Sequence, residues 1–390
     1  MGKKSDIPSN NNKYPLAASP IDIGPVKLKN RIVFPTWQVN YANTDGTVSE
    51  KLLEFYTAMA DGGCGLIFTG CAVVSPDTVA FNRVMRIDDD RYLPGLRKLF
   101  QEIESRGSVP GIQLIHYGRQ ALTSVTGCEL IAPSPIPCPV MSKFDPHYKL
   151  REMTVDDIHR VYNDFIAAAA RAAEAGARVI EVHAAHGYLL NEFLSPYSNH
   201  RTDDYGGNAI NRARLILQII RGIKDKLGNR VAISLRVSGN EFVEGGLRPI
   251  DFKDLIRQFE QNGIDMLNVS AGVYQSMERI VPPAKLGVAP HIDITAELKQ
   301  YSRVPVCAVG SIDSLELAEE VLYAGKAELV AMGRAQVADP AIVNKSLLGK
   351  ESEIRKCIKC SKCTFWTTGD PQMYCSVNPA YQRPQKVLNE

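Results

Sequence analysis

Two histidines and a tyrosine stand close together in the stretch EVHAAHGYLLNEFLSP, residues 181–196. A two-histidine metal site on a helix usually follows the pattern H-E-x-x-H, which this sequence lacks. The imidazole N–H groups of His183 and His186 could instead converge on a substrate oxygen and stabilise negative charge that develops there. The phenol of Tyr188 could then protonate an adjacent carbon. Histidines that only fill polar positions in the core or on the surface remain an alternative.

Four cysteines lie together near the C-terminal end, at Cys357, Cys360, Cys363 and Cys375, with the spacing C-x2-C-x2-C-x11-C. In a cytosolic enzyme, clustered cysteines indicate metal or redox chemistry more than disulfides. Structural zinc sites often carry two C-x2-C pairs, which this pattern does not contain. Three close cysteines and a distant fourth suit an iron–sulfur cluster better. Zinc and an empty, vestigial motif remain alternatives.

Short apolar runs alternate with longer amphipathic stretches from about residue 26 to 345, and they predict the elements that position these groups. Eight strands are predicted, at 31–35, 64–70, 109–115, 178–183, 230–237, 264–270, 304–310 and 327–333. Among the helices are 154–176, 208–228 and 314–325, the first opening with Thr154 and closing on Gly176. Eight strands alternating with helices predict an α/β fold, a (β/α)8 TIM barrel. An open doubly wound sheet is the runner-up, but no G-x-G-x-x-G follows the first strand.

The longest connection follows the third strand, at 117–153, and contains five prolines. Chemistry in a TIM barrel lies on the loops at the carboxyl ends of the strands, where His183 also stands. A loop of this length is more often functional than accidental, and its prolines predict a semi-rigid covering segment. A disordered insertion is the alternative.

Composition excludes several classes of protein. With 45% hydrophobic and 23% charged residues, the chain has the balance of a globular protein. A net charge of +2, with no basic tract beyond Lys3 and Lys4, speaks against nucleic acid and membrane partners. The first 20 residues lack the apolar core of a secretory signal, and no run of about 18 apolar residues exists, so a cytoplasmic protein is expected. Five scattered cysteines are expected to be small buried hydrophobes: Cys64, Cys71, Cys128, Cys138 and Cys307.

The segment HAAHGYLLNEFLSPYSNHRTDDYGGNAINRARL, residues 183–215, resembles the signature of the Old Yellow Enzyme / NADH:flavin oxidoreductase family. The resemblance extends over roughly residues 20 to 345 and implies a (β/α)8 barrel, bound FMN and reduction of electron-poor C=C bonds. His183 and His186 correspond to the pair that binds the substrate's carbonyl or nitro oxygen, and Tyr188 corresponds to the proton donor.

The same resemblance assigns flavin contacts to the first three strands. NRIVFPTWQ places backbone around Pro35 and Thr36 against the isoalloxazine, and Gln38 stands where the family usually has threonine, cysteine or histidine. This departure puts the redox potential in doubt, although the amide can still donate a hydrogen bond. Cys71 allows close approach of the ring, and Gln113 matches the amide that pairs with the flavin pyrimidine.

Later strands would hold the rest of the cofactor. Arg236 matches the position near flavin N1 and O2, where a guanidinium favours the anionic hydroquinone. AVGSI and AMGRA match the family's phosphate end, in the loops that bind phosphate in many TIM barrels. Gly310, Ser311 and Gly333 would bring backbone N–H groups to the phosphate, and Arg334 would add charge-assisted bonds.

The cysteine tail resembles the branch of the family that contains 2,4-dienoyl-CoA reductase and trimethylamine dehydrogenase. That resemblance implies a [4Fe–4S] cluster held by Cys357, Cys360, Cys363 and Cys375. It divides the chain into an FMN-binding barrel, residues 1–345, and a cysteine-rich iron–sulfur extension, residues 346–390. The large members continue into further flavin- and nucleotide-binding domains. We therefore expect electrons to come either from NAD(P)H directly or from a separate reductase or electron-transfer protein.

Together these features predict an FMN-dependent ene-reductase that acts on an enone, enoate or enoyl-CoA substrate. Hydride would pass from FMN to the β-carbon, and Tyr188 would protonate the α-carbon. An amine dehydrogenase, a Schiff-base aldolase and a non-catalytic electron-transfer subunit are the alternatives. The substrate and the oligomeric state stay open, a homo-oligomer included.

Overall fold

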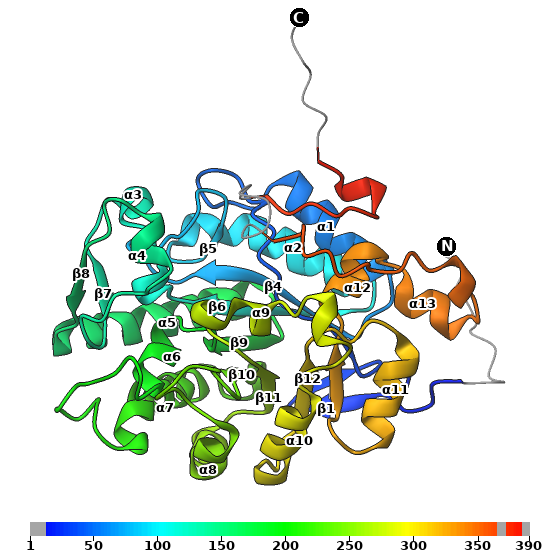
Figure 1. Ribbon diagram of the computed structural model, residues 1–390. Helices are drawn as coiled ribbons and strands as arrows, with labels where there is room; N and C mark the ends of the chain where they lie inside the picture. Colours follow the sequence, from blue (N-terminus) through cyan, green and yellow to red (C-terminus); the bar gives the residue numbers. More distant parts are fainter. Residues whose placement is uncertain (1–12, 365–371, 384–390) are drawn as a thin grey trace, which may run out of the picture.

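A computed structural model describes residues 13–364 and 372–383 of the chain (Figure 1). Eight parallel strands form a closed barrel, because the last of them pairs back with the first. In order around the barrel they are β3 (Ile32–Phe34), β4 (Leu66–Val73), β6 (Val109–Ile115), β9 (Val179–Ala184), β10 (Ala232–Ser238), β11 (Met266–Ser270), β12 (Val306–Val309) and β13 (Leu329–Ala331). The predicted TIM barrel is confirmed, and each of the eight predicted strands overlaps one of these. A short strand, β5 (Met85–Arg86), pairs with the end of β4.

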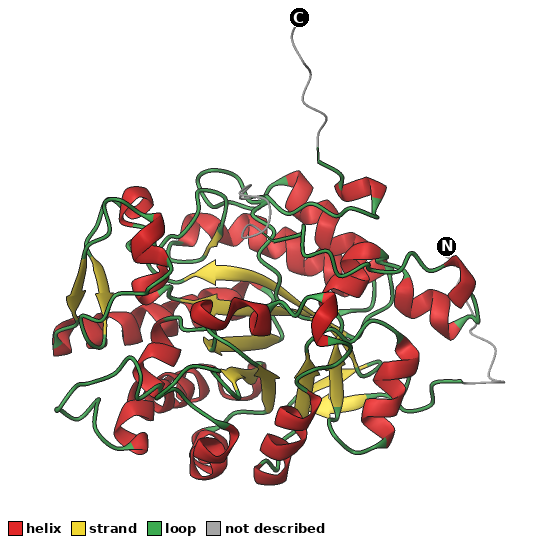
Figure 2. Ribbon diagram, viewed as in Figure 1, coloured by secondary structure: helices red, strands yellow, loops and turns green. Residues whose placement is uncertain are grey.

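Helices alternate with the barrel strands and surround them, as Figure 2 shows. The outer helices are α1 (Glu50–Asp61), α2 (Leu93–Ser105), α5 (Val155–Ala175), α7 (Ala209–Leu227), α8 (Lys253–Asn262), α10 (Ile292–Tyr301), α11 (Leu315–Tyr323) and α13 (Ile342–Leu347). Helix α5 begins where the sequence predicts, since Thr154 and Asp157 form a capping box. It ends at Gly176, whose φ of 108° is a conformation that favours glycine.

An N-terminal hairpin packs against the amino-terminal part of the barrel interior. Its antiparallel strands are β1 (Ile21–Ile23) and β2 (Val26–Leu28). Ile23, Val26 and Leu28 share one buried cluster with residues near the starts of the barrel strands, such as Leu66 and Val179. Burying each such side chain contributes roughly 1.5–3 kcal/mol. The hairpin thus fills one end of the barrel and leaves the carboxyl rim for chemistry.

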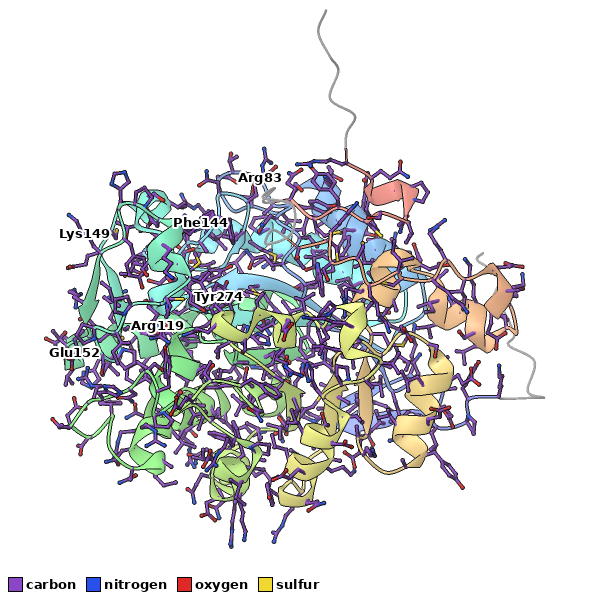
Figure 3. The ribbon with its side chains drawn as sticks, viewed as in Figure 1. Arg83, Arg119, Phe144, Lys149, Glu152 and Tyr274 are labelled. Carbon is purple, nitrogen blue, oxygen red and sulfur yellow. The ribbon has the colours of Figure 1, made fainter. Side chains whose placement is uncertain are left out.

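The connection after β6 forms a separate covering segment over residues 117–153. It contains α3 (Thr123–Thr126), β7 (Leu130–Ala132), α4 (Met141–Phe144) and β8 (Leu150–Glu152), and β7 pairs with β8. Its buried anchors include Arg119, which donates to the carbonyl oxygen of Ile136 at 3.0 Å. In Figure 3, Lys149 lies at the outer edge of this segment, whereas Phe144, which is 51% exposed, lies on the side toward the rest of the molecule.

Three further short helices lie in the loops after β9, β11 and β13. They are α6 (Leu189–Leu194), α9 (Met277–Ile280) and α12 (Gly333–Ala338). In a parallel barrel these loops meet at the carboxyl rim, which makes them walls of any site there.

Four of the five scattered cysteines are buried, as predicted: Cys64, Cys71, Cys138 and Cys307. The prediction for Cys128 is wrong, because this thiol is exposed in the turn that follows α3 and Gly127. Of the helices in the described residues, none has the length and apolar character needed to cross a bilayer. Lys3, Lys4 and the start of the segment examined for a secretory signal lie outside the described residues.

Burial of Glu192 on α6 predicts a pH-dependent stability. The side chain is fully buried and accepts a hydrogen bond from the Arg119 N–H at 2.9 Å, and burial raises its pKa from 4.5 to about 8. The folded protein therefore binds this proton more tightly than the unfolded chain. The resulting stability is fully present below pH 4.5 and is lost as pH rises through about 8. In the wild type we expect this group to lower the unfolding free energy by roughly 2 kcal/mol as the pH rises from about 6 to about 9. In Glu192→Gln we expect this part of the decline to be absent.

Urea unfolding of the wild type and the variant at several pH values measures this difference. Parallel pH profiles for the two proteins would show that Glu192 does not carry the effect.

Candidate active site

Two adjoining cavities open at the carboxyl rim of the barrel. We name them by their walls: the arginine cavity contains Arg334, and the histidine cavity contains His183 and His186. They hold about 600 and 830 Å³ of space between protein atoms, their open mouths included. Both are bordered by the same five residues: Thr36, Trp37, Arg236, Ile280 and Val281. Shared walls make them two parts of one elongated site.

All thirteen residues that the sequence assigns to catalysis or cofactor binding line these cavities. The arginine cavity contains Pro35, Thr36, Arg236, Gly310, Ser311, Gly333 and Arg334. The histidine cavity contains Thr36, Gln38, Cys71, Gln113, His183, His186, Tyr188 and Arg236. The structure therefore brings together residues from seven of the eight barrel strands or the loops that follow them.

The two imidazoles lie side by side and are both buried. The N–H of Ala185 donates to Nδ1 of His183 at 3.3 Å, which places the His183 proton on Nε2. Nε2 of His183 is 3.4 Å from Nδ1 of His186, and Nε2 of His186 is 2.8 Å from Oγ of Ser270. Burial, with the nearby Arg236 charge, lowers the pKa of both histidines well below the ordinary value, so both are neutral.

This pair can donate to one acceptor in the cavity. Nε2 of His183 and Nδ1 of His186 are close enough to bond the same oxygen. For both to donate, His186 must carry its proton on Nδ1, and the Ser270 hydroxyl can then donate to Nε2. The backbone of His186 has a φ of 62°, and its N–H donates to Oγ of Ser238 at 2.9 Å, which holds the ring in place.

Tyr188 adds a protonated phenol beside the histidines. Its ring centroid lies 4.9 Å from that of His183, and its hydroxyl is 3.0 Å from the hydroxyl of Tyr274. Burial raises the pKa of the Tyr188 phenol, so the group keeps its proton at neutral pH. Tyr188 can thus act as a proton donor but is a poor base. Tyr274, labelled in Figure 3, also lines the histidine cavity.

The amides beside Cys71 are held by neighbouring strands and loops. Gln113 donates from Nε2 to Glu181 at 2.7 Å, and its Oε1 is 3.2 Å from Sγ of Cys71. Gln38 accepts from the Tyr117 hydroxyl at 2.9 Å and donates to Asn40. The amide of Gln38, the departure from the family pattern, is therefore already bonded on both sides.

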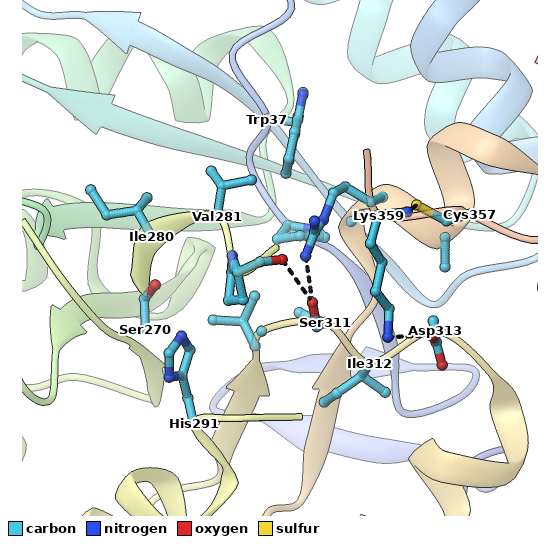
Figure 4. Close-up of a pocket in the computed structure, with 18 of the residues that line it drawn as sticks. Trp37, Ser270, Ile280, Val281, His291, Ser311, Ile312, Asp313, Cys357 and Lys359 are labelled. Carbon is cyan, nitrogen blue, oxygen red and sulfur yellow. Dashed lines mark hydrogen bonds and ion pairs between the residues drawn. The ribbon is translucent and has the colours of Figure 1, made fainter. Parts of the chain in front are cut away.

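The arginine cavity combines positive charge with a tight backbone turn (Figure 4). Gly310 has a φ of 129°, and a Cβ there would meet Cδ2 of His291 at 2.6 Å, so this position requires glycine. Arg334 donates to Oγ of Ser311, and Lys359 forms an ion pair with Asp313 at 2.9 Å. Cationic side chains around a glycine turn suit a phosphate group.

Buried polar atoms in these walls fit an elongated ligand with acceptor atoms. Three of them have no hydrogen-bond partner within the part of the chain that the structure describes: Oγ1 of Thr36, Nε of Arg236 and Nη1 of Arg334. Leaving such groups unpaired costs about 1–3 kcal/mol each. All three residues line the arginine cavity, so a ligand with a phosphate and ring acceptors would relieve this cost. The residues present therefore fit FMN.

The four clustered cysteines line a single small cavity of their own, which Arg334 also borders. The segment is tightly curled: Lys359 and Ser361 have φ values of 52° and 56°, and the Lys359 N–H is 3.4 Å from Sγ of Cys357. In the residues that the structure describes, no group of three or more His, Cys, Asp or Glu side chains is arranged to hold a metal ion. The cysteines converge, but a metal cluster is not shown.

Several residues in or beneath the site received no role from sequence reasoning: Trp37, Glu181, Ser270, Tyr274 and Lys359. For Glu181, Ser270 and Tyr274 a signal existed, since each lies in or just after a predicted strand. For Lys359 no such signal existed, because only the tertiary fold brings the cysteine segment to the rim.

Comparison with known proteins identifies the family of this chain. Residues 18–353 match the NADH:flavin oxidoreductase / NADH oxidase family, which confirms the resemblance found in residues 183–215. NADH oxidase of Thermoanaerobacter brockii is 38% identical over 365 residues, covering 93% of this chain and 55% of that protein. Cinnamate reductase of Clostridium sporogenes is 30% identical over 397 residues, covering 96% of this chain and 59% of that protein.

A solved structure of similar fold is the complex of 2-naphthoyl-CoA reductase with 2-naphthoyl-CoA. It has a TM-score of 0.88 and 26% sequence identity, covering 94% of this chain and 57% of that chain. The chain thus spans a little over half the length of these relatives.

Burial of Cys71 predicts a thiol that is inert in spite of its place in the cavity. Burial raises its pKa to about 12, so little thiolate forms at neutral pH. With iodoacetamide at about pH 7.5, we expect the exposed Cys128 to be alkylated at least about tenfold faster than Cys71. Peptide mass spectrometry over time measures both rates. Equal rates in the folded protein would contradict the burial of Cys71.

Proposed function

The chain belongs to the NADH:flavin oxidoreductase / NADH oxidase family and is a flavin-dependent oxidoreductase, and we propose that it reduces the C=C bond of α,β-unsaturated carbonyl compounds. The observation that carries this proposal is one cavity shared by two neutral imidazoles and a protonated phenol. Their arrangement suits a substrate that needs an oxygen held and a carbon protonated.

Each residue has a defined part in this reaction. FMN, when bound and reduced, supplies the hydride for the β-carbon. His183 and His186 hold the carbonyl oxygen by N–H donation and stabilise the enolate charge that develops on it. Tyr188 transfers its proton to the α-carbon, so hydride and proton together complete the reduction. The hydroxyl of Tyr274, 3.0 Å away, can return a proton to Tyr188.

Holding FMN is the proposed role of the remaining cavity residues. Arg334, Ser311 and the turn at Gly310 would bind the phosphate, with Gly333 beside them. Pro35, Thr36, Gln38 and Cys71 would border the ring system, and Gln113 and Arg236 would border its polar edge. Each of these residues lines at least one of the two cavities.

The names of the relatives support the substrate class and the electron donor. Cinnamate is an α,β-unsaturated carboxylate, and 2-naphthoyl-CoA is an aromatic acyl thioester. We therefore place enoates and acyl-CoA thioesters ahead of simple enones as substrates. NADH is the proposed source of electrons, and a separate reductase protein is the second option.

A [4Fe–4S] cluster held by Cys357, Cys360, Cys363 and Cys375 is part of the proposal. Its support is the convergence of the four thiols on one cavity and the left-handed turns at Lys359 and Ser361. Alternating backbone turns of this kind direct N–H groups inward, as in many iron–sulfur sites. We accordingly propose that the FMN-binding barrel ends at residue 345 and that the cysteine-rich extension begins at residue 346.

Replacing Tyr188 tests the proposed reaction. With Tyr188→Phe we expect FMN to remain bound and reoxidation of the reduced protein by cinnamoyl-CoA or a simple enone to slow by about 100-fold or more, since the proton donor is lost. Stopped-flow absorbance measures this rate. Tyr117→Phe is the matched control, because Tyr117 is also buried and packs on Tyr188 but bonds Gln38.

An unchanged rate of reoxidation in Tyr188→Phe would overturn the assignment of Tyr188 as the proton donor. Rapid flavin reduction by amines, with no reoxidation by any enone or enoate, would favour an amine dehydrogenase.

Metal analysis tests the cluster. Protein isolated without oxygen should contain about four iron atoms and four inorganic sulfides per chain. Cys363→Ala should lose most of both, whereas Cys128→Ala, which changes an exposed and distant thiol, should keep them. One zinc atom per chain and no sulfide would show a zinc site instead.

A further inference from the structure

We propose that Glu181 is a positioning residue for the flavin: it fixes which end of the Gln113 amide faces the cavity and balances the charge of Arg236. This inference rests on the flavin site proposed above. Glu181 is fully buried inside the barrel and lines neither cavity. Its side chain can act on a ligand only through its neighbours.

Three donors from three other barrel strands converge on the Glu181 carboxylate of β9. Gln113 of β6 donates to Oε1 at 2.7 Å. Ser234 of β10 and Asn268 of β11 donate to Oε2 at 2.9 and 2.7 Å. Nη1 of Arg236 lies 4.0 Å from Oε1. This set of bonds ties the strands together just beneath the rim.

The carboxylate decides the orientation of the Gln113 amide. An amide can present either its oxygen or its NH2 group, whereas an ionised carboxylate only accepts. Nε2 of Gln113 must therefore face Glu181, which leaves Oε1 toward the cavity, where Sγ of Cys71 is 3.2 Å away. The pyrimidine edge of a flavin carries an imide N–H between two carbonyl groups. An outward Oε1 is the acceptor that this N–H needs.

The same carboxylate offsets the positive charge of Arg236. Both groups are buried, and removing one partner of a buried pair leaves the other charge uncompensated. Without Glu181, the guanidinium would attract the negative charge of reduced flavin more strongly. Glu181 therefore holds the reduction potential of the bound flavin lower than Arg236 alone would set it.

The test is Glu181→Gln, which keeps the size of the side chain and removes its charge. One amide oxygen cannot accept from three donors as the carboxylate does, so the Gln113 amide is free to turn. We expect FMN to bind about tenfold more weakly and its midpoint potential to shift to more positive values. Fluorescence titration of the apoprotein with FMN and a spectroscopic redox titration measure these two effects.

Glu241→Gln is the matched control. Glu241 is also buried and accepts from three groups, Asn191, Ser195 and Leu247, but it lines neither cavity. It should leave FMN affinity and potential unchanged. Glu181→Asp keeps the charge but withdraws the carboxylate from Gln113, so we expect weaker FMN binding with little change in potential. This variant decides the question if Glu181→Gln does not fold.

A double-mutant cycle separates positioning from general destabilisation. If Glu181 acts on affinity through Gln113, Glu181→Gln should weaken FMN binding by less than about twofold in a Gln113→Ala background. An equal loss in both backgrounds, or unchanged affinity and potential in Glu181→Gln, would overturn the inference. Failure of the wild-type protein to bind FMN would instead overturn the proposed function.

Discussion

Parallel closure of the barrel is the constraint on which the site depends. When eight parallel strands close, every strand delivers its carboxyl end to the same rim. Residues as distant in sequence as Thr36 and Arg334 therefore border one cavity. The hairpin β1–β2 packs into the opposite end, and that apolar packing leaves a single rim for polar groups. Charged and hydrogen-bonding side chains can gather at the carboxyl rim because the hairpin completes the apolar core at the other end of the barrel.

Burial then sets the chemistry of those side chains. Removal from water disfavours charge, so His183 and His186 stay neutral and Tyr188 keeps its proton. Both outcomes are what the proposed donors to a substrate oxygen and carbon require. Arg236 stays beside the carboxylate of Glu181, which compensates its charge. Burial thus leaves neutral donors in the histidine cavity, while the Arg236 guanidinium lies 4.0 Å from the Glu181 carboxylate.

The cysteine segment lies against both parts of the site. Cys357 lines the arginine cavity, Cys363 lines the histidine cavity, and all four cysteines share a third cavity bordered by Arg334. Lys359 joins the segment to the loop after β12 through Asp313. A redox centre held here would be next to the proposed flavin, which is the arrangement that short-range electron transfer needs. The fold thereby links two motifs that the sequence leaves far apart.

The sequence alone determined the barrel, because apolar strands alternate with amphipathic helices and cap residues such as Thr154 and Gly176 act locally. The sequence also predicted thirteen residues that line the cavities, because each belongs to a motif contained in one continuous stretch of the chain. It could not reveal that Glu181 orients Gln113, that Ser270 bonds His186, or that Tyr274 meets Tyr188. These contacts join different strands or their loops, and only closure of the barrel sets the distances between them. It also missed the exposure of Cys128, because burial depends on what the tertiary fold places over a residue.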